Sequence, residues 1–338
     1  MIQLNERQHC YSKKTKSMTV KNSKGYSRKK IRQSFKYFDE SGKIVNDSKI
    51  LDRIHHLVIP PNWTNVWISK NPRSNLQAFG FDQKERKQYI YHPKFVQQQQ
   101  TEKFRKVLYM GQYLQDLRKI SSRHLKHPDW NMEKLCAVAF KIMDSTLIRI
   151  GNKRYTLENK SYGLSTLEKR HVTVCDHVIT LAYKGKKGVF QEKSWRDKKQ
   201  AKLIGELLAI KGKNLFNIGK EGLKGTFCGR SFNVYLRDHC PGQINCKDIR
   251  IWGASREAFR LLAQTKQEEN IAQRKKQLNE VIKIVAKQLG NTKTVAQNYY
   301  IHPTIQKVYL EAKFPFVREK LTVSKLEYKL FRFLLKYG

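Results

Sequence analysis

Residues 289–303 have the sequence LGNTKTVAQNYYIHP, and this stretch marks the point where a long helix gives way to a short irregular segment. Upstream of it, apolar residues repeat at helical spacing over 268–289, and Gly290 is a typical helix stop. The segment that follows holds two adjacent tyrosines, Tyr299 and Tyr300, shortly before Pro303. A tyrosine in such a place is most often part of a core or a surface, so its meaning depends on the rest of the chain.

Helical periodicity dominates residues 96–338, which we predict to be the larger of two domains. Strand-like runs at 171–174, 179–183 and 189–190 interrupt the helices, and Lys186 lies in the turn between the last two. The other helices are predicted at 197–209, 230–238 and 254–264. This domain is therefore expected to be mostly α-helical with a small three-stranded sheet.

The part of the chain before residue 96 has a different pattern. Residues 31–95 hold short β-rich runs and one predicted helix over 48–57, which indicates a small, mostly β domain. Residues 1–30 are polar and basic and are predicted to be a flexible arm. The fold class is therefore α+β, with a β-rich domain followed by a mostly α-helical one.

The composition indicates a polyanionic partner. Lys and Arg number 68 against 28 Asp and Glu, a net charge of +40 spread along the chain. Basic side chains that neutralise phosphates release condensed counterions, so nucleic acid is the leading partner. A membrane partner is disfavoured because no apolar run approaches the roughly 20 residues that span a bilayer.

The six cysteines form no C-x-x-C pair, which is typical of reduced thiols in an intracellular protein. The pair His239–Cys240 suggests zinc, but no second ligand pair stands nearby at zinc spacing, so no metal site is predicted. A phosphate-binding loop of the G-x-x-x-x-G-K-[ST] type is also missing from the sequence, and no cofactor is expected.

Four segments of the larger domain suggest chemistry when they are taken together. They are LIRIGN at 147–152, the turn Gly185–Lys186, KDIRIWG at 247–253 and the stretch at 289–303. Each is weak alone, since an arginine at a helix end usually caps carbonyls and a Gly-Lys pair is usually only a turn. Two arginines in one site, however, suit a phosphodiester that gains negative charge during attack, because guanidinium matches phosphate bidentately.

In this order and at these separations, the four segments resemble the type IB DNA topoisomerases, specifically the compact poxvirus-type branch of viruses and bacteria. Further stretches resemble the same branch, namely IPPNWTNVWI at 59–68, GFD at 80–82, RKQYIYHP at 86–93 and YGLSTL at 162–167. The resemblance extends over about residues 32–310. It implies the fold shared by tyrosine recombinases and type IB topoisomerases.

The resemblance also implies roles for individual residues. Tyr300 matches the nucleophile, Arg149 and Arg250 match the pair that holds the scissile phosphate, and Lys186 matches the general acid. Lys247 matches an auxiliary basic residue. Asn291 stands where poxvirus members have histidine, and an amide can donate a hydrogen bond to phosphate without carrying charge. The implied DNA contacts are Gln88, Tyr89, Tyr91 and Tyr155.

The implied activity is relaxation of supercoiled DNA without ATP or a required metal. One strand is nicked through a covalent 3′-phosphotyrosyl intermediate, the duplex swivels, and the strand is resealed. The expected partner is double-stranded DNA, held by a two-domain clamp that acts as a monomer. The expected location is the bacterial cytoplasm or nucleoid, or a virion.

Two other functions share parts of the pattern. A tyrosine recombinase or integrase uses the same arginines, lysine and tyrosine, but usually carries His-x-x-Arg where this chain has Lys247 and Arg250. The β-rich front domain also favours the topoisomerase. A non-catalytic, basic DNA-packaging protein would share the charge but would not need the four segments.

Overall fold

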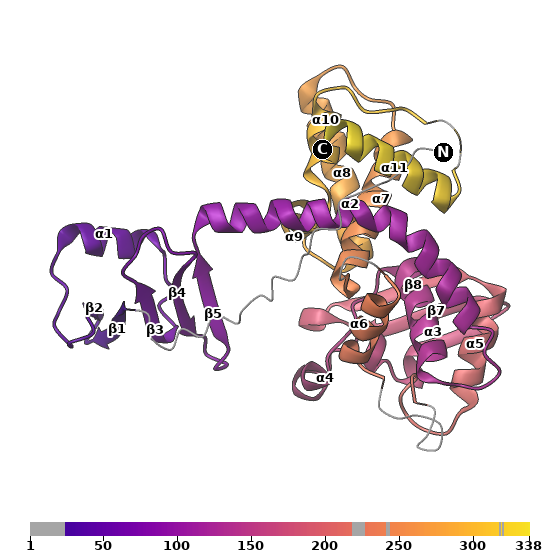
Figure 1. The fold of residues 1–338 in the computed structure, drawn as a ribbon, viewed down its shortest axis with the longest axis horizontal. Coiled ribbons are helices and arrows are strands. Elements are labelled where there is room, and N and C mark those ends of the chain that lie inside the picture. The colour runs from indigo at the N-terminus through magenta and orange to yellow at the C-terminus, as the bar shows by residue number, and fades with distance from the viewer. Residues whose placement is uncertain (1–23, 218–226, 241–243, 318, 320) are drawn as a thin grey trace, which may run out of the picture. The chain divides into compact units, whose positions relative to one another are not determined.

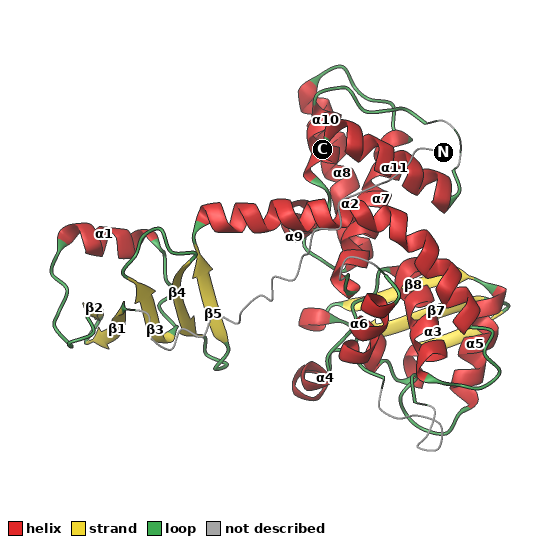
Figure 2. Cartoon of the chain, viewed as in Figure 1, coloured by secondary structure: helices red, strands yellow, loops and turns green. Residues whose placement is uncertain are grey.

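The computed structural model describes residues 24–217, 227–240, 244–317, 319 and 321–338 (Figure 1). The chain divides into two compact units, Met1–Gln100 and Thr101–Gly338. Strands dominate the first unit and helices the second, so the predicted α+β fold class is confirmed (Figure 2).

The first unit is built on an antiparallel sheet with the strand order β2-β1-β3-β4-β5. Its strands are β1 (Gly25–Ile31), β2 (Ser34–Phe38), β3 (Thr64–Ser69), β4 (Leu76–Phe81) and β5 (Lys87–Tyr91). Helix α1 (Ser48–His56) begins where the Asp47 side chain accepts hydrogen bonds from the backbone of Lys49 and Ile50. Ile54 of this helix is buried in one core with side chains of the sheet, namely Tyr37, Val66, Ile68 and Ala78.

Strand β1 corrects the predicted arm over residues 1–30, which extended too far toward the C-terminus. The sequence of β1 is polar, yet its backbone pairs with β2 on one side and β3 on the other. Arg28 is buried and donates to the carbonyls of Ile59, Pro60 and Trp63 at 2.8–3.1 Å. These carbonyl oxygens take the place of water around its charge. The remainder of the predicted arm, residues 1–23, lies outside the described residues.

The second unit combines helices with a small antiparallel sheet of order β6-β7-β8. The strands are β6 (Val172–Cys175), β7 (Val178–Lys184) and β8 (Phe190–Arg196), and short 3-10 turns cover Leu164–Thr166, Lys169–His171 and Lys186–Gly188. The helices are α2 (Pro93–His124, which begins within the first unit), α3 (Met132–Thr146), α4 (Lys153–Asn159), α5 (Lys198–Ala209), α6 (Gly229–Asp238), α7 (Cys246–Ala263), α8 (Ile271–Leu289), α9 (Lys293–Tyr299), α10 (Pro303–Leu310) and α11 (Val323–Tyr337).

Helix α7 lies at the centre of this unit. Its Trp252 is fully buried against Gly111 of α2, where any side chain would collide with the indole ring. The helix begins at Cys246, eight residues before the predicted start at 254, because the Asn245 side chain caps the backbone N–H of Lys247. The predicted start was therefore wrong, and the correction places Arg250 inside a buried helix.

A buried cluster of charges ties four helices together. Arg118 of α2 contacts Asp144 of α3 at 2.7 Å and Glu327 of α11 at 2.6 Å, and Arg256 of α7 contacts Glu327 at 2.7 Å. The Trp252 indole N–H also donates to Glu327 over 3.0 Å. Burial alone would raise the pKa of Glu327, but the hydrogen bond from Arg118 and the charges of both arginines lower it. The cluster is thus a fully paired ionic core.

Candidate active site

Arg149 is positioned by the end of α3. Leu147 adopts a left-handed conformation (φ 54°) that ends the helix, and the chain turns so that Arg149 follows two residues later. Its Nη2 donates to the Gly290 carbonyl over 2.9 Å and also to the side-chain oxygen of Asn291. Burial lowers the pKa of Arg149, yet a guanidinium remains charged in proteins. Arg149 is therefore a fixed positive charge beside the start of the 289–303 stretch.

Arg250 is buried and held at three points. Its Nε donates to the Leu147 carbonyl over 2.7 Å and its Nη2 to the Leu289 carbonyl over 2.9 Å. Its Nη1 donates to the hydroxyl oxygen of Tyr300 over 3.3 Å. Burial lowers the pKa of Arg250 to about 10, and the like charge of Arg149 is a further cause. Two backbone carbonyls thus aim this guanidinium at the Tyr300 hydroxyl.

Tyr300 and Tyr299 differ in what their side chains contact. Tyr300 follows the end of α9, and its carbonyl accepts a hydrogen bond from the Ser255 hydroxyl at 3.2 Å. Its half-buried ring lies under the guanidinium of Arg250, 5.2 Å from ring centroid to Cζ. The Tyr299 ring is 43% exposed and lies beside the ammonium of Lys103. Only Tyr300 of the pair therefore presents its hydroxyl to an arginine.

Asn291 carries an unpaired donor in this site. Gly290 ends α8 in a left-handed conformation (φ 62°), and the backbone N–H of Asn291 donates to the Ala286 carbonyl over 2.9 Å. The side-chain oxygen of Asn291 accepts from Arg149, but its buried Nδ2 has no hydrogen-bond partner among the described residues. A buried amide N–H without an acceptor is costly. The group fits a ligand that supplies an acceptor, such as a phosphate oxygen.

Three further predicted site residues, Lys186, Lys247 and Tyr155, have side chains that point to solvent. Lys186 is exposed at the tip of the β7–β8 hairpin, which the Gly185 N–H closes by donating to the Val189 carbonyl over 2.8 Å. Lys247 is exposed in the first turn of α7, and Tyr155 is 48% exposed on α4. The structure therefore brings Arg149, Arg250, Asn291 and Tyr300 together and leaves these three side chains open to solvent.

Lys193 of β8 was not among the residues predicted from the sequence. Its ammonium donates to the Gln288 carbonyl near the end of α8, and its pKa is lowered to about 8 by burial and then by the charges of Arg250 and Arg149. The predicted third strand covered only 189–190, whereas β8 extends to Arg196. Lys193 pairs with buried Leu181 in the sheet, so the alternation of a longer strand would have placed it on the inner face.

In the first unit, β5 presents two tyrosines to solvent. Tyr89 and Tyr91 are 47% and 41% exposed, and their rings stack with centroids 5.9 Å apart. Gln88 points to the other face, where its amide donates to Asp82 over 2.9 Å. Core packing is therefore not the role of the two tyrosines.

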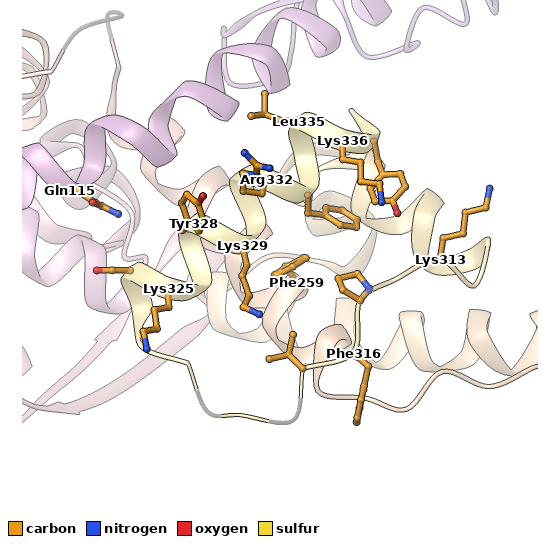
Figure 3. A pocket seen from close by; sticks show the side chains of 15 residues that line it. Gln115, Phe259, Lys313, Phe316, Lys325, Tyr328, Lys329, Arg332, Leu335 and Lys336 are labelled. Carbon is orange, nitrogen blue, oxygen red and sulfur yellow. The ribbon is translucent and has the colours of Figure 1, made fainter. Parts of the chain in front are cut away.

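The described residues also line a groove of about 1140 Å³ at the C-terminal helix (Figure 3). Its side chains come from α11, the loop before it, Phe259 of α7 and Gln115 of α2. None of the candidate site residues lines it. Arg149, Arg250 and Tyr300 thus belong to a separate site that is built from charges rather than an apolar cavity.

Among the helices in the described part of the chain, none combines the length and the apolar character that crossing a membrane requires.

Comparison with known proteins identifies the family. The family model "Eukaryotic DNA topoisomerase I, catalytic core" matches residues 92–317, and "Bacterial DNA topoisomerase IB, N-terminal domain" matches residues 34–82. DNA topoisomerase 1B of Acanthamoeba polyphaga mimivirus is 31% identical over 274 residues, which cover 78% of this chain and 81% of that protein. DNA topoisomerase 1B of vaccinia virus (strain Copenhagen) is 23% identical over 308 residues, covering 85% and 94%.

These matches favour the topoisomerase over the recombinase and the packaging protein, because they cover both the strand-rich unit and the helical unit. The chain belongs to the type IB DNA topoisomerases of the compact viral and bacterial branch, enzymes that relax supercoiled DNA.

Proposed function

We propose that Tyr300 is the nucleophile of this topoisomerase. Its hydroxyl proton passes to water while the oxygen attacks a backbone phosphorus, a P–O bond forms to the tyrosine, and the bond to the 5′ oxygen of the next nucleotide breaks. The other strand stays intact and the duplex swivels. Attack by the 5′ hydroxyl on the phosphotyrosine then reverses both steps. Because one ester replaces another, resealing needs no ATP.

The contacts of Tyr300 support this role. Arg250 donates to its hydroxyl over 3.3 Å, a bond that favours loss of the phenolic proton as the oxygen attacks. Arg250 is itself fixed by the carbonyls of Leu147 and Leu289, so the charge needs no reorganisation when the reaction begins. This hydrogen bond is the observation that carries the proposal.

Arg149 and Asn291, together with Arg250, are proposed to bind the nonbridging oxygens of the scissile phosphate. Arg149 supplies a guanidinium beside Asn291, and the amide supplies the buried Nδ2 donor that lacks a partner. A phosphate oxygen placed there would satisfy this donor. We propose that Asn291 acts as a neutral donor where the poxvirus-type enzymes carry histidine.

Lys186 is proposed as the general acid that gives its proton to the departing 5′ oxygen, with Lys247 as an auxiliary cation. The exposed tip of the β7–β8 hairpin leaves the Lys186 ammonium available to bound DNA, and a glycine lies on each side of the pair Lys186–Lys187. Tyr155 is proposed to contact a phosphate near the break. Gln88, Tyr89 and Tyr91 are proposed to contact duplex DNA from the first unit, and the enzyme is proposed to act as a monomer.

Trapping the covalent intermediate tests the proposal. A duplex whose short downstream fragment dissociates after cleavage leaves the protein bound to the 3′ phosphate, and peptide mapping identifies the modified residue. We expect the adduct on Tyr300, with no adduct in Tyr300→Phe and normal DNA binding by that variant, because the charge that drives binding is unchanged. Tyr299→Phe is the matched control and should form the adduct. An adduct mapped to Tyr299 would overturn the assignment.

A further inference from the structure

A cluster of possible metal ligands lies where α2, α3 and α6 meet. It consists of His124 at the end of α2, Glu133 in the first turn of α3 and His239, which caps the end of α6. One ligand atom from each side chain lies within 4.8 Å of the others. None of these residues has a part in the proposed cleavage reaction.

The two imidazoles face one carboxylate. Nε2 of His124 lies 4.0 Å from Oε2 of Glu133, and Nε2 of His239 lies 3.9 Å from Oε1. These separations are too long for hydrogen bonds. They are close to the spacing of ligands on one ion, since two ligands bound at about 2.1 Å in tetrahedral geometry lie about 3.4 Å apart. Small side-chain rotations would therefore complete such a site.

The orientation of the His124 ring is fixed by a hydrogen bond to its second nitrogen. Its Nδ1 is hydrogen-bonded to the Tyr235 hydroxyl at 3.0 Å, which leaves Nε2 toward Glu133. The His239 ring packs edge-on against both His124 and Tyr235, with centroids 4.9 Å and 4.7 Å apart. In metal-binding histidines, the nitrogen that does not bind the metal commonly makes a hydrogen bond like that of His124 Nδ1. This bond fixes the orientation and the tautomer of the ring.

The carboxylate of this cluster faces solvent. Glu133 is exposed, so a water molecule can reach a fourth ligand position.

We propose that His124, Glu133 and His239 bind a divalent transition-metal ion, with Zn²⁺ as the best match, and that the ion joins the ends of α2, α3 and α6. Two imidazoles and one carboxylate form a ligand set that zinc accepts, with water in the fourth position. The proposed role is structural and does not depend on the cleavage mechanism. The prediction of no metal considered only short sequence spacing, and these ligands come from three separate helices.

Metal titration of the whole protein, freed of bound metal with a chelator and then dialysed, tests the proposal. Calorimetry with Zn²⁺ should show one site per chain, and Co²⁺ should give visible d–d absorption without a thiolate charge-transfer band. His239→Gln and Glu133→Gln should each raise the Kd for zinc by about 10–100-fold or more. Removing only the hydrogen-bond partner of a metal ligand already causes a loss of this size. Zinc should raise the melting temperature of the unchanged protein but not that of these variants.

His127→Gln is the matched control, because His127 lies three residues beyond His124 and is exposed, and its ring is hydrogen-bonded to the Asp129 backbone. It should bind zinc as the unchanged protein does. Circular dichroism without metal establishes that each variant is folded. Three results would overturn the site: no stoichiometric binding, binding retained in both ligand variants, or a thiolate band, which would assign the ion to an exposed cysteine such as Cys228.

Discussion

Nη1 of Arg250 lies 3.3 Å from the hydroxyl oxygen of Tyr300, although fifty residues separate the two in the chain. The link exists because α7 buries Arg250 and two backbone carbonyls hold the rest of its guanidinium. The proposed nucleophile is thus paired with a charge whose position is set before DNA binds. A group that is already aimed costs no reorganisation during the reaction.

Replacing either arginine by lysine should cut the rate of strand cleavage by on the order of 10²–10³, the loss typical of removing one preorganised charge stabiliser. An ammonium cannot reproduce the three directed bonds of Arg250 or the paired contacts of Arg149. Single-turnover cleavage of a duplex substrate measures the effect. Arg260→Lys is the control, because Arg260 lies on the same helix but pairs with Glu257. Unimpaired cleavage by Arg149→Lys or Arg250→Lys would remove the proposed role of that residue.

Lys186→Ala should bind DNA almost normally but cleave about 10²–10⁴-fold more slowly, as expected for loss of a general acid. A substrate with sulfur in place of the 5′ bridging oxygen has a leaving group that needs no proton. Cleavage of this substrate should be restored in Lys186→Ala but not in Arg149→Ala. Lys184→Ala and Lys187→Ala are controls from the same hairpin. If sulfur rescues one of these controls instead, Lys186 is not the acid.

Lys193 should make cleavage sensitive to pH near 8. Its lowered pKa of about 8 means that the ammonium is charged below this pH and neutral above it. The cleavage rate at subsaturating DNA, which reports the free enzyme, should therefore fall as the pH rises through about 8. Lys193→Met should be slower at low pH and lack this decline, whereas Lys184→Met should keep it. An identical pH profile in Lys193→Met would exclude the lysine as its source.

Replacing Tyr89 and Tyr91 together by alanine should weaken DNA binding without unfolding the protein, because both rings are exposed. If each loses one hydrogen bond worth about 1 kcal/mol, Kd rises about 30-fold. Equilibrium binding to a short duplex measures the change, and the melting temperature of the free protein should stay close to its original value. Tyr328→Ala, an exposed tyrosine on α11, is the control. A large fall in melting temperature would show that the pair stabilises the sheet instead.

His302 should make the fold less stable in mild acid. Burial, with a further contribution from Lys103, lowers the pKa of this imidazole to about 4, so it is neutral in the folded protein. The unfolded chain takes up the proton below about 6.5. Stability is therefore fully present above that pH and is lost as the pH falls toward 4, by about 3 kcal/mol in all.

Urea unfolding at pH 7 and pH 5 measures this change in the free energy of unfolding. The unchanged protein is compared with a variant that lacks the His302 imidazole. His302→Asn is the suitable variant, because asparagine can still accept the bond that Nδ1 takes from the Thr304 N–H at the start of α10. The unchanged protein should lose about 2 kcal/mol more than the variant between these two pH values. Equal losses in both proteins would mean that His302 does not titrate in this way.

The sequence predicted the fold class, and its resemblance to a known family indicated the residues that the structure gathers around Tyr300. It did not predict β1, whose charged Arg28 is buried by bonds to carbonyls that lie far along the chain. The burial of Glu327 could not be predicted for the same reason, because in the sequence this residue resembles an ordinary exposed charge of an amphipathic helix. Polar residues that are buried through distant partners leave no local pattern to detect.

The site shows the same limit on a smaller scale. Lys193 stands in a polar run, and only the pairing of β8 with β7 reveals that it faces inward. His124, Glu133 and His239 converge through the packing of three helices, so their spacing in the sequence carries no metal-binding signature. Contacts of this kind follow from tertiary packing, whereas hairpin tips and helix caps follow from neighbouring residues.

The ionic cluster completed by Glu327 also bears on the order of assembly during protein synthesis. The ribosome releases Arg118, Asp144 and Arg256 before Glu327, and until then two arginines share one carboxylate. Burying them in that state would leave a charge uncompensated. The packing of α2, α3 and α7 around these arginines therefore depends on a carboxylate that is synthesised after all three of those helices.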